Sequence, residues 1–180
     1  MNKSSTFLRD IEPLKNKNYQ TNLSSQKAIE YSGKVLDKRF KRKTVMIFGS
    51  FDFLHAGHFH FFEFAKKQGD KLVVVIARDK NIEKIKGKKP FHSEADRKKM
   101  LAQIRFIDEV YLGDLKNVYK IIRTINPDII ALGYDQEVFV ENLARYLKEN
   151  NFKTKIVRAK PYKSNIYKSS KMKKYLERFI

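Results

Sequence analysis

Two histidines lie three residues apart in the segment 49–58, which follows a short apolar run and leads into a stretch with helical spacing. Because only Ala56 and Gly57 separate His55 from His58, both rings can face one side at the start of a helix. The N-terminus of a helix attracts anions, and the backbone amides around Ser50 can face phosphate oxygens. Two imidazoles placed there can donate hydrogen bonds to a triphosphate and stabilise the charge that grows on a departing pyrophosphate.

A close histidine pair also has simpler interpretations, namely a metal-binding pair or an incidental surface pair. A zinc site would need a third ligand, but His60 and His92 are the only other imidazoles in the sequence, which has no cysteine. Gly57, between the two histidines, favours close approach of a ligand over a metal-binding helix face. Together with Gly49 and Asp52 in the preceding turn, the pattern favours a phosphate site, and we expect no metal site built from protein side chains.

The bulk composition limits the classes of protein to consider. The chain has 180 residues, of which 42% are hydrophobic, and this suits one domain with one core. Its apolar runs are too short to cross a bilayer and residues 1–4 lack the apolar core of a secretory signal, so we expect a cytoplasmic protein without a membrane partner. The net charge of +19, from 39 basic and 20 acidic residues, favours anionic ligands. It leaves two classes open, an enzyme acting on phosphates and a nucleic-acid binder.

Short β-branched apolar runs alternate with stretches of helical spacing from residue 44 onward. Such runs, bounded by Gly, Asp and Pro, indicate strands buried on both faces, and the alternation predicts an α/β fold with a Rossmann-like parallel sheet flanked by helices. The expected strands are 45–48, 72–77, 109–112, 128–132 and 155–157, and the expected helices are 58–67, 93–104, 117–125 and 137–149. In an open sheet of this kind, ligands lie at the carboxyl ends of the strands, which is where the segment 49–58 falls.

The same motif carries a resemblance to a known family. Residues 44 to about 170 resemble the cytidylyltransferase-like nucleotidyltransferases, whose hallmark is His-x-Gly-His after a Gly-[Thr/Ser]-Phe-Asp turn. Here these motifs read His55-Ala56-Gly57-His58 and Gly49-Ser50-Phe51-Asp52. Two segments are similar to bacterial glycerol-3-phosphate cytidylyltransferases: 91–97 and 107–110. Three further segments are similar to archaeal FAD synthases, the closer likeness: 75–79, 84–90 and 127–136.

The resemblance implies a set of nucleotide-binding residues. His55 and His58 would be catalytic and, with their neighbours, would hold the triphosphate, while Asp135 would lie beside the ribose or the base. The expected nucleotide contacts are Gly49, Ser50, Phe51, Asp52, His55, Ala56, Gly57, His58, Gly133, Asp135, Tyr162, Ser169 and Ser170. The resemblance also implies direct attack of the acceptor phosphate on the α-phosphorus, Mg²⁺ or another divalent cation bound with the nucleoside triphosphate, and a homodimer.

Several other residues are candidates for phosphate contacts. Residues 84–89 are expected to form a basic loop after the second strand, and Lys86 is the candidate within it because Gly87 follows; a solvated charge run explains at least two of its four lysines. Arg97 matches an arginine of the similar cytidylyltransferases, although a surface salt bridge explains it equally well. Ser169-Ser170 would open the last helix, where a plain helix cap and a phosphate contact are compatible.

The N-terminal residues differ in composition from the rest. Residues 1–25 are rich in Asn, Ser and Lys without a sustained period, a short helix is expected from 24 to 37, and a basic run follows. We therefore divide the chain into a basic, partly helical N-terminal extension, 1–43, and a nucleotidyltransferase domain, 44–180.

Three functions are compatible with these residues. The first is an adenylyltransferase similar to FAD synthase, which would convert ATP and FMN into FAD and pyrophosphate. The second is a cytidylyltransferase that makes a CDP-alcohol from CTP and glycerol-3-phosphate or a similar phosphate. The third is a basic nucleic-acid-binding protein, which would not need an intact phosphate motif. We therefore expect an enzyme whose partners are ATP, or else CTP, and a small phosphorylated acceptor, with FMN favoured and nucleic acid not among them.

Overall fold

A central sheet of five parallel strands organises the computed structural model, which describes residues 42–137, 140, 142–167, 169–176 and 178. The strands are β1 (Thr44–Gly49), β2 (Lys71–Ile76), β3 (Glu109–Leu112), β4 (Ile129–Leu132) and β5 (Lys155–Arg158). The helices are α1 (Ala56–Lys66), α2 (Asp79–Lys86), α3 (Glu94–Ala102), α4 (Lys120–Ile125), α5 (Leu143–Glu149) and α6 (Ser169–Leu176). None of these helices, which are those of the described residues, is long and apolar enough to cross a membrane.

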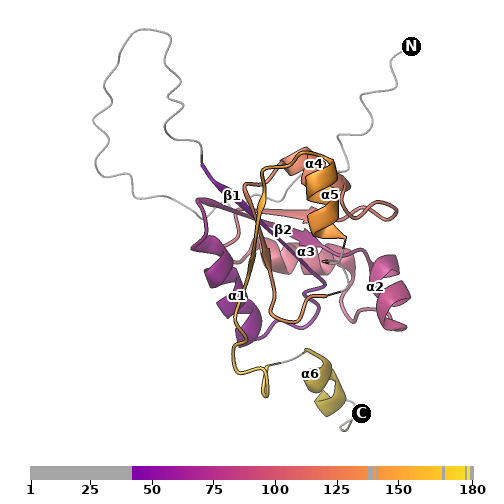
Figure 1. The fold of residues 1–180 in the computed structure, drawn as a ribbon. Helices are drawn as coiled ribbons and strands as arrows, with labels where there is room; N and C mark the ends of the chain where they lie inside the picture. The colour runs from indigo at the N-terminus through magenta and orange to yellow at the C-terminus, as the bar shows by residue number, and fades with distance from the viewer. Residues whose placement is uncertain (1–41, 138–139, 141, 168, 177, 179–180) are drawn as a thin grey trace.

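Helices cover both faces of the sheet, and alternate residues of the buried strands divide between two cores (Figure 1). Val45 and Ile47 of β1 belong to the core shared with α1 and α3, whereas Met46 belongs to the core shared with α4 and α5. None of these three side chains has exposed surface. A strand buried on both faces has no polar side, which is why the run at the centre of β1 is continuously apolar.

The strand order β3-β2-β1-β4-β5 creates the place for a ligand. The chain proceeds from β1 outward through β2 to β3 and then returns to the other side of β1 for β4 and β5. This reversal opens a crevice at the carboxyl ends of β1 and β4, where open α/β sheets bind their ligands. Helix α6 lies beyond one end of the sheet, apart from the helices that flank its faces (Figure 1).

The five strands and the parallel α/β fold confirm the sequence-based prediction, and Ser93, the first residue of the expected helix 93–104, is the N-cap of α3. The Ser93 hydroxyl accepts a hydrogen bond from the Asp96 amide at 3.2 Å. Three helices are shorter than predicted, since α3 ends at residue 102 rather than 104, α4 begins at 120 rather than 117 and α5 begins at 143 rather than 137. For α4 the reason is local: the Asp114 carboxylate accepts the Lys116 and Asn117 amides at 2.8 and 2.9 Å and forms a turn instead. The expected helix 24–37 lies outside the described residues, so the division at residue 43 stays a prediction.

The segment after β2 corrects one prediction, because Lys84 and Lys86 belong to helix α2 rather than to a loop. Two local signals account for the helix. Asp79 provides an acidic side chain in the first turn, and Gly87 ends the helix with a φ of 68°. Glycine adopts this left-handed conformation without a steric cost, which makes it a common residue after the last helical turn. Lys86 therefore projects from the end of a rigid element.

Carboxylates hold the amino ends of the strands. Asp108 accepts hydrogen bonds from the Leu72 amide at 2.7 Å and from the Lys66 ammonium group at 2.6 Å. Asp128 likewise accepts one from the Thr44 amide at 2.9 Å. Since Leu72 has no exposed surface, water could not replace the Asp108 oxygen as the acceptor for the Leu72 amide if that carboxylate were removed.

We expect Asp108→Ala to lower the free energy of unfolding by about 1–3 kcal/mol, because it removes the acceptor of a buried amide. Urea denaturation followed by circular dichroism measures the change. The matched control is Asp70→Ala, since exposed Asp70 accepts a hydrogen bond from the amide of exposed Lys43 at 2.8 Å. Its cost should stay near 0.5 kcal/mol, as is typical of surface changes. Equal losses in the two variants would contradict the role given to Asp108.

Candidate active site

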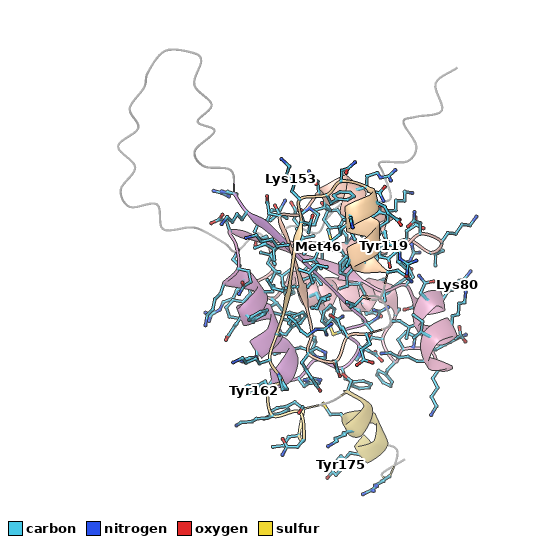
Figure 2. The ribbon with its side chains drawn as sticks, viewed as in Figure 1. Met46, Lys80, Tyr119, Lys153, Tyr162 and Tyr175 are labelled. Carbon is cyan, nitrogen blue, oxygen red and sulfur yellow. The ribbon has the colours of Figure 1, made fainter. Side chains whose placement is uncertain are left out.

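A cavity of about 510 Å³, within the range of small-molecule sites, opens at the carboxyl ends of the strands. The expected nucleotide-binding residues that line it are Gly49, Ser50, Phe51, His55, Gly57, His58, Gly133, Asp135, Tyr162 and Ser169. Lys86 also lines it, whereas Asp52, Ala56 and Arg97 do not. Ser170 belongs to α6, but its side chain is not among those that the structure describes. Figure 2 shows Tyr162 at the end of the sheet that faces α6.

The imidazole rings of His55 and His58 stack on each other, with centroids 3.9 Å apart and planes inclined by 23°. His55 precedes the first residue of α1, and its carbonyl accepts the His58 amide at 2.8 Å, so the first turn of the helix brings both rings to one side, as their spacing predicts. The first turn of α1 carries no acidic side chain. No carboxylate of that turn therefore competes with an incoming anion for the positive end of the helix.

Both imidazoles are neutral at pH 7. Burial lowers the pKa of His58 to about 3, with further lowering by the charges of His55 and Lys86. Burial also lowers the pKa of His55, against the opposing effects of its own backbone and of Asp135. Among the described residues, the Nδ1 atoms of both rings are buried without a hydrogen-bond partner. A buried acceptor without a partner is tolerated more readily than a buried N–H, which favours the tautomer that carries its proton on Nε2.

The ring of Phe51 supports His58. Its edge-on contact with the His58 ring has a centroid distance of 5.4 Å and an interplanar angle of 74°. Phe51 is 4% exposed and has a φ of 48°, an uncommon backbone conformation for an aromatic residue. A Cβ atom on Gly49 would lie 2.5 Å from the Phe51 ring. Gly49 is therefore needed to make room for the ring of Phe51.

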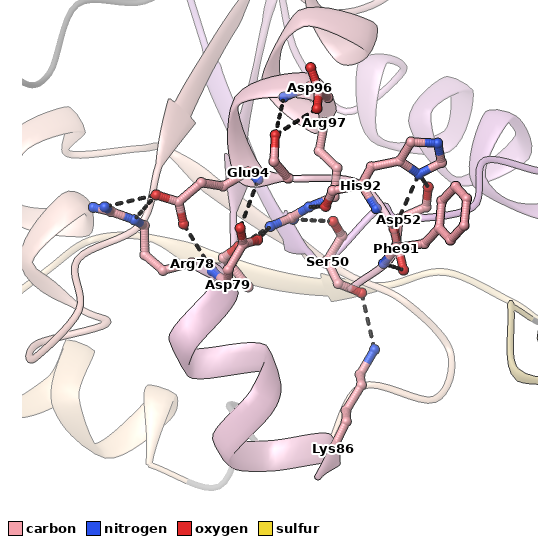
Figure 3. Close-up of polar contacts among 12 residues, drawn as sticks. Ser50, Asp52, Arg78, Asp79, Lys86, Phe91, His92, Glu94, Asp96 and Arg97 are labelled. Atoms are coloured by element: carbon pink, nitrogen blue, oxygen red, sulfur yellow. Dashed lines mark hydrogen bonds and ion pairs between the residues drawn. The ribbon is translucent and has the colours of Figure 1, made fainter. Parts of the chain in front are cut away.

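Arg97 connects the loops that follow β1 and β2 (Figure 3). Its guanidinium group donates hydrogen bonds to the carbonyl oxygens of Ser50 and, at 2.9 Å, Ala77. It also donates to the Asp79 carboxylate at 2.6 Å, and its Nε donates to the His92 carbonyl at 3.2 Å. Because the side chain has no exposed surface and does not line the cavity, its position does not support the expected phosphate contact. Its partners indicate instead that it sets the separation of two cavity loops.

Ser50 and Lys86 meet at the wall of the cavity. The Lys86 ammonium group donates a hydrogen bond to the Ser50 hydroxyl at 3.1 Å (Figure 3). Its charge is also near enough to His58 to help lower the pKa of that ring. An exposed ammonium group in this place can reach a phosphate that lies over the two histidines.

Asp52 lies in a different place from the one expected of a nucleotide contact. Its carboxylate, in a residue that is 6% exposed, accepts the amides of Phe91 and His92, both at 2.9 Å. A ring nitrogen of His92 also lies 2.8 Å from the Asp52 carbonyl oxygen. Asp52 therefore connects the loop after β1 to the segment that leads into α3, and it shapes the site from behind the cavity wall.

The loop after β4 is held by Gln136 and Arg158, neither of which was an expected site residue. The Gln136 amide group donates to the Phe48 carbonyl of β1 and accepts from the Gly133 amide, both at 2.7 Å. Arg158 of β5 donates to the carbonyl oxygens of Gly133 and Gln136 at 2.8 and 3.0 Å. These bonds keep Asp135 at the wall of the cavity.

Aromatic side chains from the segment after β5 approach the histidines. The Tyr167 ring stacks on His55 with a centroid distance of 6.2 Å, and the Ser169 hydroxyl lies 3.3 Å from His55 Nε2. The Tyr162 ring stacks on His60 at 4.5 Å. Tyr167 was not among the expected site residues, because no local motif distinguishes it from the other tyrosines of a basic segment.

Comparison with known proteins agrees with this geometry. The family model described as cytidylyltransferase-like matches residues 46–175, a range that contains every residue lining the cavity. This chain belongs to the cytidylyltransferase-like family. The resemblance inferred from its motifs is thereby confirmed.

Several proteins share most of their length with this cytidylyltransferase-like chain. It is 41% identical over 142 residues to a protein named FAD synthase from Thermococcus sibiricus, an alignment that covers 77% of this chain and 96% of the relative. It is 36% identical over 149 residues to the FAD synthase of Thermococcus onnurineus, covering 81% and 97% of the two chains. Among solved structures, the lipopolysaccharide core biosynthesis protein from Thermoplasma volcanium superposes with a TM-score of 0.63 and 37% identity, over 67% of this chain and 98% of that one.

The lowered histidine pKa values predict that this cytidylyltransferase-like protein loses stability in acid. Because the pKa of His58 falls from 6.5 to about 3 on folding, the unfolded chain takes up a proton first as the pH decreases. The free energy of unfolding should therefore be unaffected above about pH 6.5 and decrease below it. Urea denaturation at a series of pH values should show a smaller decrease for His58→Gln than for the unmodified protein. Parallel pH profiles would exclude His58 as the cause.

We expect Arg97→Met to lower the free energy of unfolding by at least about 3 kcal/mol, because it leaves carbonyl oxygens and the Asp79 carboxylate without their donor. Arg97→Lys should be intermediate, since an ammonium group keeps the charge but cannot reproduce the planar fork. Lys99→Met, at an exposed position of the same helix, is the control and should stay within about 0.5 kcal/mol. Thermal and urea unfolding measure all three, and equal stability of Arg97→Met and Lys99→Met would refute the connecting role.

Proposed function

We propose that the protein is an FAD synthase, an adenylyltransferase that converts ATP and FMN into FAD and pyrophosphate. The observation that carries the proposal is the neutral His55–His58 pair at the N-terminus of α1, set in a cavity beside Ser50 and Lys86. The relatives named FAD synthase, which the chain matches over nearly their whole length, support the choice of ATP and FMN.

The reaction is a single displacement at phosphorus. An oxygen of the FMN phosphate attacks the α-phosphorus of ATP and forms the new P–O–P bond. The bond from the α-phosphorus to the oxygen that bridges to the β-phosphorus breaks, and pyrophosphate leaves with that electron pair. Since a phosphate monoester is largely ionised at pH 7, the attacking oxygen needs no general base. The chain therefore has to position the substrates and stabilise charge, and no covalent intermediate is required.

The two histidines suit the role of hydrogen-bond donors. With the proton on Nε2, each neutral ring offers one N–H group to a phosphate oxygen. We place the β- and γ-phosphates over the N-terminus of α1, where these groups and the helix stabilise the charge that develops on pyrophosphate. Lys86, beside Ser50, adds a positive charge at the same wall. These roles use the donors as they stand in the structure, without a preceding protonation step.

The expected nucleotide contacts in the segments after β4 and β5 follow from this placement. We propose that the ribose and adenine lie toward the loop after β4, where Gly133 and Asp135 line the cavity. Tyr162 and Ser169, which also line it, would close that side, and Ser170 stays a prediction. Because carboxylate oxygens accept hydrogen bonds from hydroxyl groups, we propose that the Asp135 side chain binds the ribose hydroxyls.

Two expectations from the family resemblance are also proposals. The described residues contain no group of three or more His, Asp or Glu side chains that could hold a metal ion. We propose that a divalent cation such as Mg²⁺ is bound by the oxygens of the triphosphate and neutralises part of their charge when present. We also propose a homodimer, which sedimentation equilibrium tests.

The central test is to incubate the protein with ATP, MgCl₂ and FMN and to resolve the flavins by chromatography. FAD should accumulate together with an equal amount of pyrophosphate. His58→Ala should reduce the rate by roughly 10²-fold or more, because it removes a donor to the developing charge. Its fold, judged by circular dichroism, should persist.

The control variant is Glu63→Ala, at an exposed position of the same helix, which should keep the unmodified rate. A panel of nucleotides and acceptors completes the test. Turnover of CTP with glycerol-3-phosphate but none of ATP with FMN would replace the proposal by the cytidylyltransferase alternative. An unchanged rate in His58→Ala would overturn the role assigned to that ring.

A further inference from the structure

The cavity extends to both sides of the histidine pair. On one side it is lined by residues of the segments 133–137 and 160–169, which follow β4 and β5, and we call this part the β4 arm. On the other side it is lined by Asn81, Ile82 and Ile85 of α2 and by Gly113, Asp114 and Val118 after β3, and we call this part the α2 arm. Because β1 is the central strand, the segment 49–58 lies between the two arms. A reaction that joins two substrates over the histidines thus has one arm for each.

The α2 arm carries apolar side chains that core packing does not explain. Ile85 is 61% exposed and Val118 is 41% exposed, and neither belongs to the two hydrophobic cores. Ile82, which is 4% exposed, adds a buried aliphatic side chain to the same lining. Exposed apolar side chains that gather in a cavity mark the place of an apolar ligand group.

The two segments of the α2 arm are held together. The Asn81 side-chain amide on α2 donates a hydrogen bond to the Asp114 carbonyl at 3.1 Å. The Asp114 carboxylate in turn accepts the amides of Lys116 and Asn117, which fixes the turn just before Val118. The apolar side chains are therefore presented by a preformed wall rather than by a loose loop, and a rigid ligand group can bind there without a large ordering cost.

Helix α2 places this apolar wall next to the phosphate site. Ile82, Ile85 and Lys86 follow the i, i+3, i+4 spacing that brings side chains to one helix face. Lys86 reaches the Ser50 hydroxyl at 3.1 Å, as Figure 3 shows, and so lies beside the wall where we place the phosphates of the substrates. A ligand with a phosphate at one end and an apolar planar body at the other fits this order of side chains.

The β4 arm is different in character. Its lining combines the charged residues Asp135, Glu137 and Lys160 with tyrosines, among them Tyr162 and Tyr167, and these groups suit the hydroxyls of a ribose and the ring of an adenine. The isoalloxazine ring of a flavin has an apolar dimethylbenzene edge, whereas a ribose has none. The exposed aliphatic side chains of Ile85 and Val118 therefore make the α2 arm the better match for this edge of the flavin.

We infer that the α2 arm binds the isoalloxazine ring of FMN, with Ile85 and Val118 as contacts that select a ring-bearing acceptor over a small polyol phosphate. This inference rests on the proposed function of the same site. A glycerol phosphate would leave these apolar side chains without contacts, so they gain nothing from the smaller acceptor.

The test compares Val118→Asp with Leu115→Asp in the full-length protein. Leu115 lies three residues earlier, is 43% exposed and does not line the cavity, so it is a matched control. Val118→Asp should raise the KM for FMN by roughly 10-fold or more, while the KM for ATP and the melting temperature stay close to those of the unmodified protein. Ile85→Gln, which replaces a largely exposed side chain by another good helix former, should raise the same KM.

Direct binding separates the inference from the proposed function. Quenching of FMN fluorescence, measured with α,β-methylene ATP present, should show weaker FMN binding in Val118→Asp by the same factor. Equal effects of Leu115→Asp and Val118→Asp, or a change in the KM for ATP instead of FMN, would overturn the inference and leave FAD synthesis standing. If the unmodified protein makes no FAD but binds FMN in a way that Val118→Asp weakens, the proposed function is wrong and the assignment of FMN to the α2 arm stands. A protein that neither binds nor converts FMN would reject both.

Discussion

The buried guanidinium group of Arg97 is the contact on which the geometry of the site depends. Parallel strands end in carbonyl groups that have no further ladder partner, and the first residues after β1 and β2 are Ser50 and Ala77. Arg97 donates to the carbonyl oxygens of both residues and to the Asp79 carboxylate that opens α2. A planar cation with five donors in a fixed arrangement can hold several acceptors at once, which an ammonium group cannot do with the same geometry. Arg97 thus fixes the distance between the loops after β1 and β2.

Gln136 has the corresponding role on the other side of β1. It accepts from the Gly133 amide and donates to the Phe48 carbonyl, so the loop after β4 is fixed to the central strand as well. Asp52 adds a third connection, from the loop after β1 to the segment before α3. Arg97, Gln136 and Asp52 can shape the site without contacting a substrate. They hold the loops in place before a ligand arrives, and a preorganised site loses less free energy on binding.

The electrostatics of the protein differ between long and short range. The chain carries a net charge of +19, which draws anionic substrates toward it from a distance. At the centre of the site, however, burial keeps the imidazoles of His55 and His58 neutral. Neutral N–H donors can stabilise a developing charge without binding the ground-state triphosphate as tightly as two cations would, and Lys86 remains as a charge beside them. This division suits an enzyme that must release pyrophosphate.

The sequence by itself determined the features that depend on neighbouring residues. The apolar runs predicted all five strands, because a strand buried on both faces has no polar side, and the spacing of His55 and His58 predicted that their rings share one side of α1. The motif around them also carried the resemblance to the family, which the matching family model confirms. Helix α2 was missed although its signals are local, because a run of lysines in its last turn and beyond resembles a solvated loop.

Tertiary structure decided the features that join distant parts of the chain. Asp52 meets Phe91 39 residues away, Gln136 meets Phe48 88 residues away, and Ser169 meets His55 114 residues away. The sequence offered Arg97 as a phosphate contact or a surface salt bridge, and burial of its side chain beneath two loops favours neither. Ile85 and Val118 are likewise brought together only by tertiary structure. They line one wall because α2 packs beside the turn after β3. No local pattern encodes such partners, because their contacts arise from the packing of separate elements around one sheet.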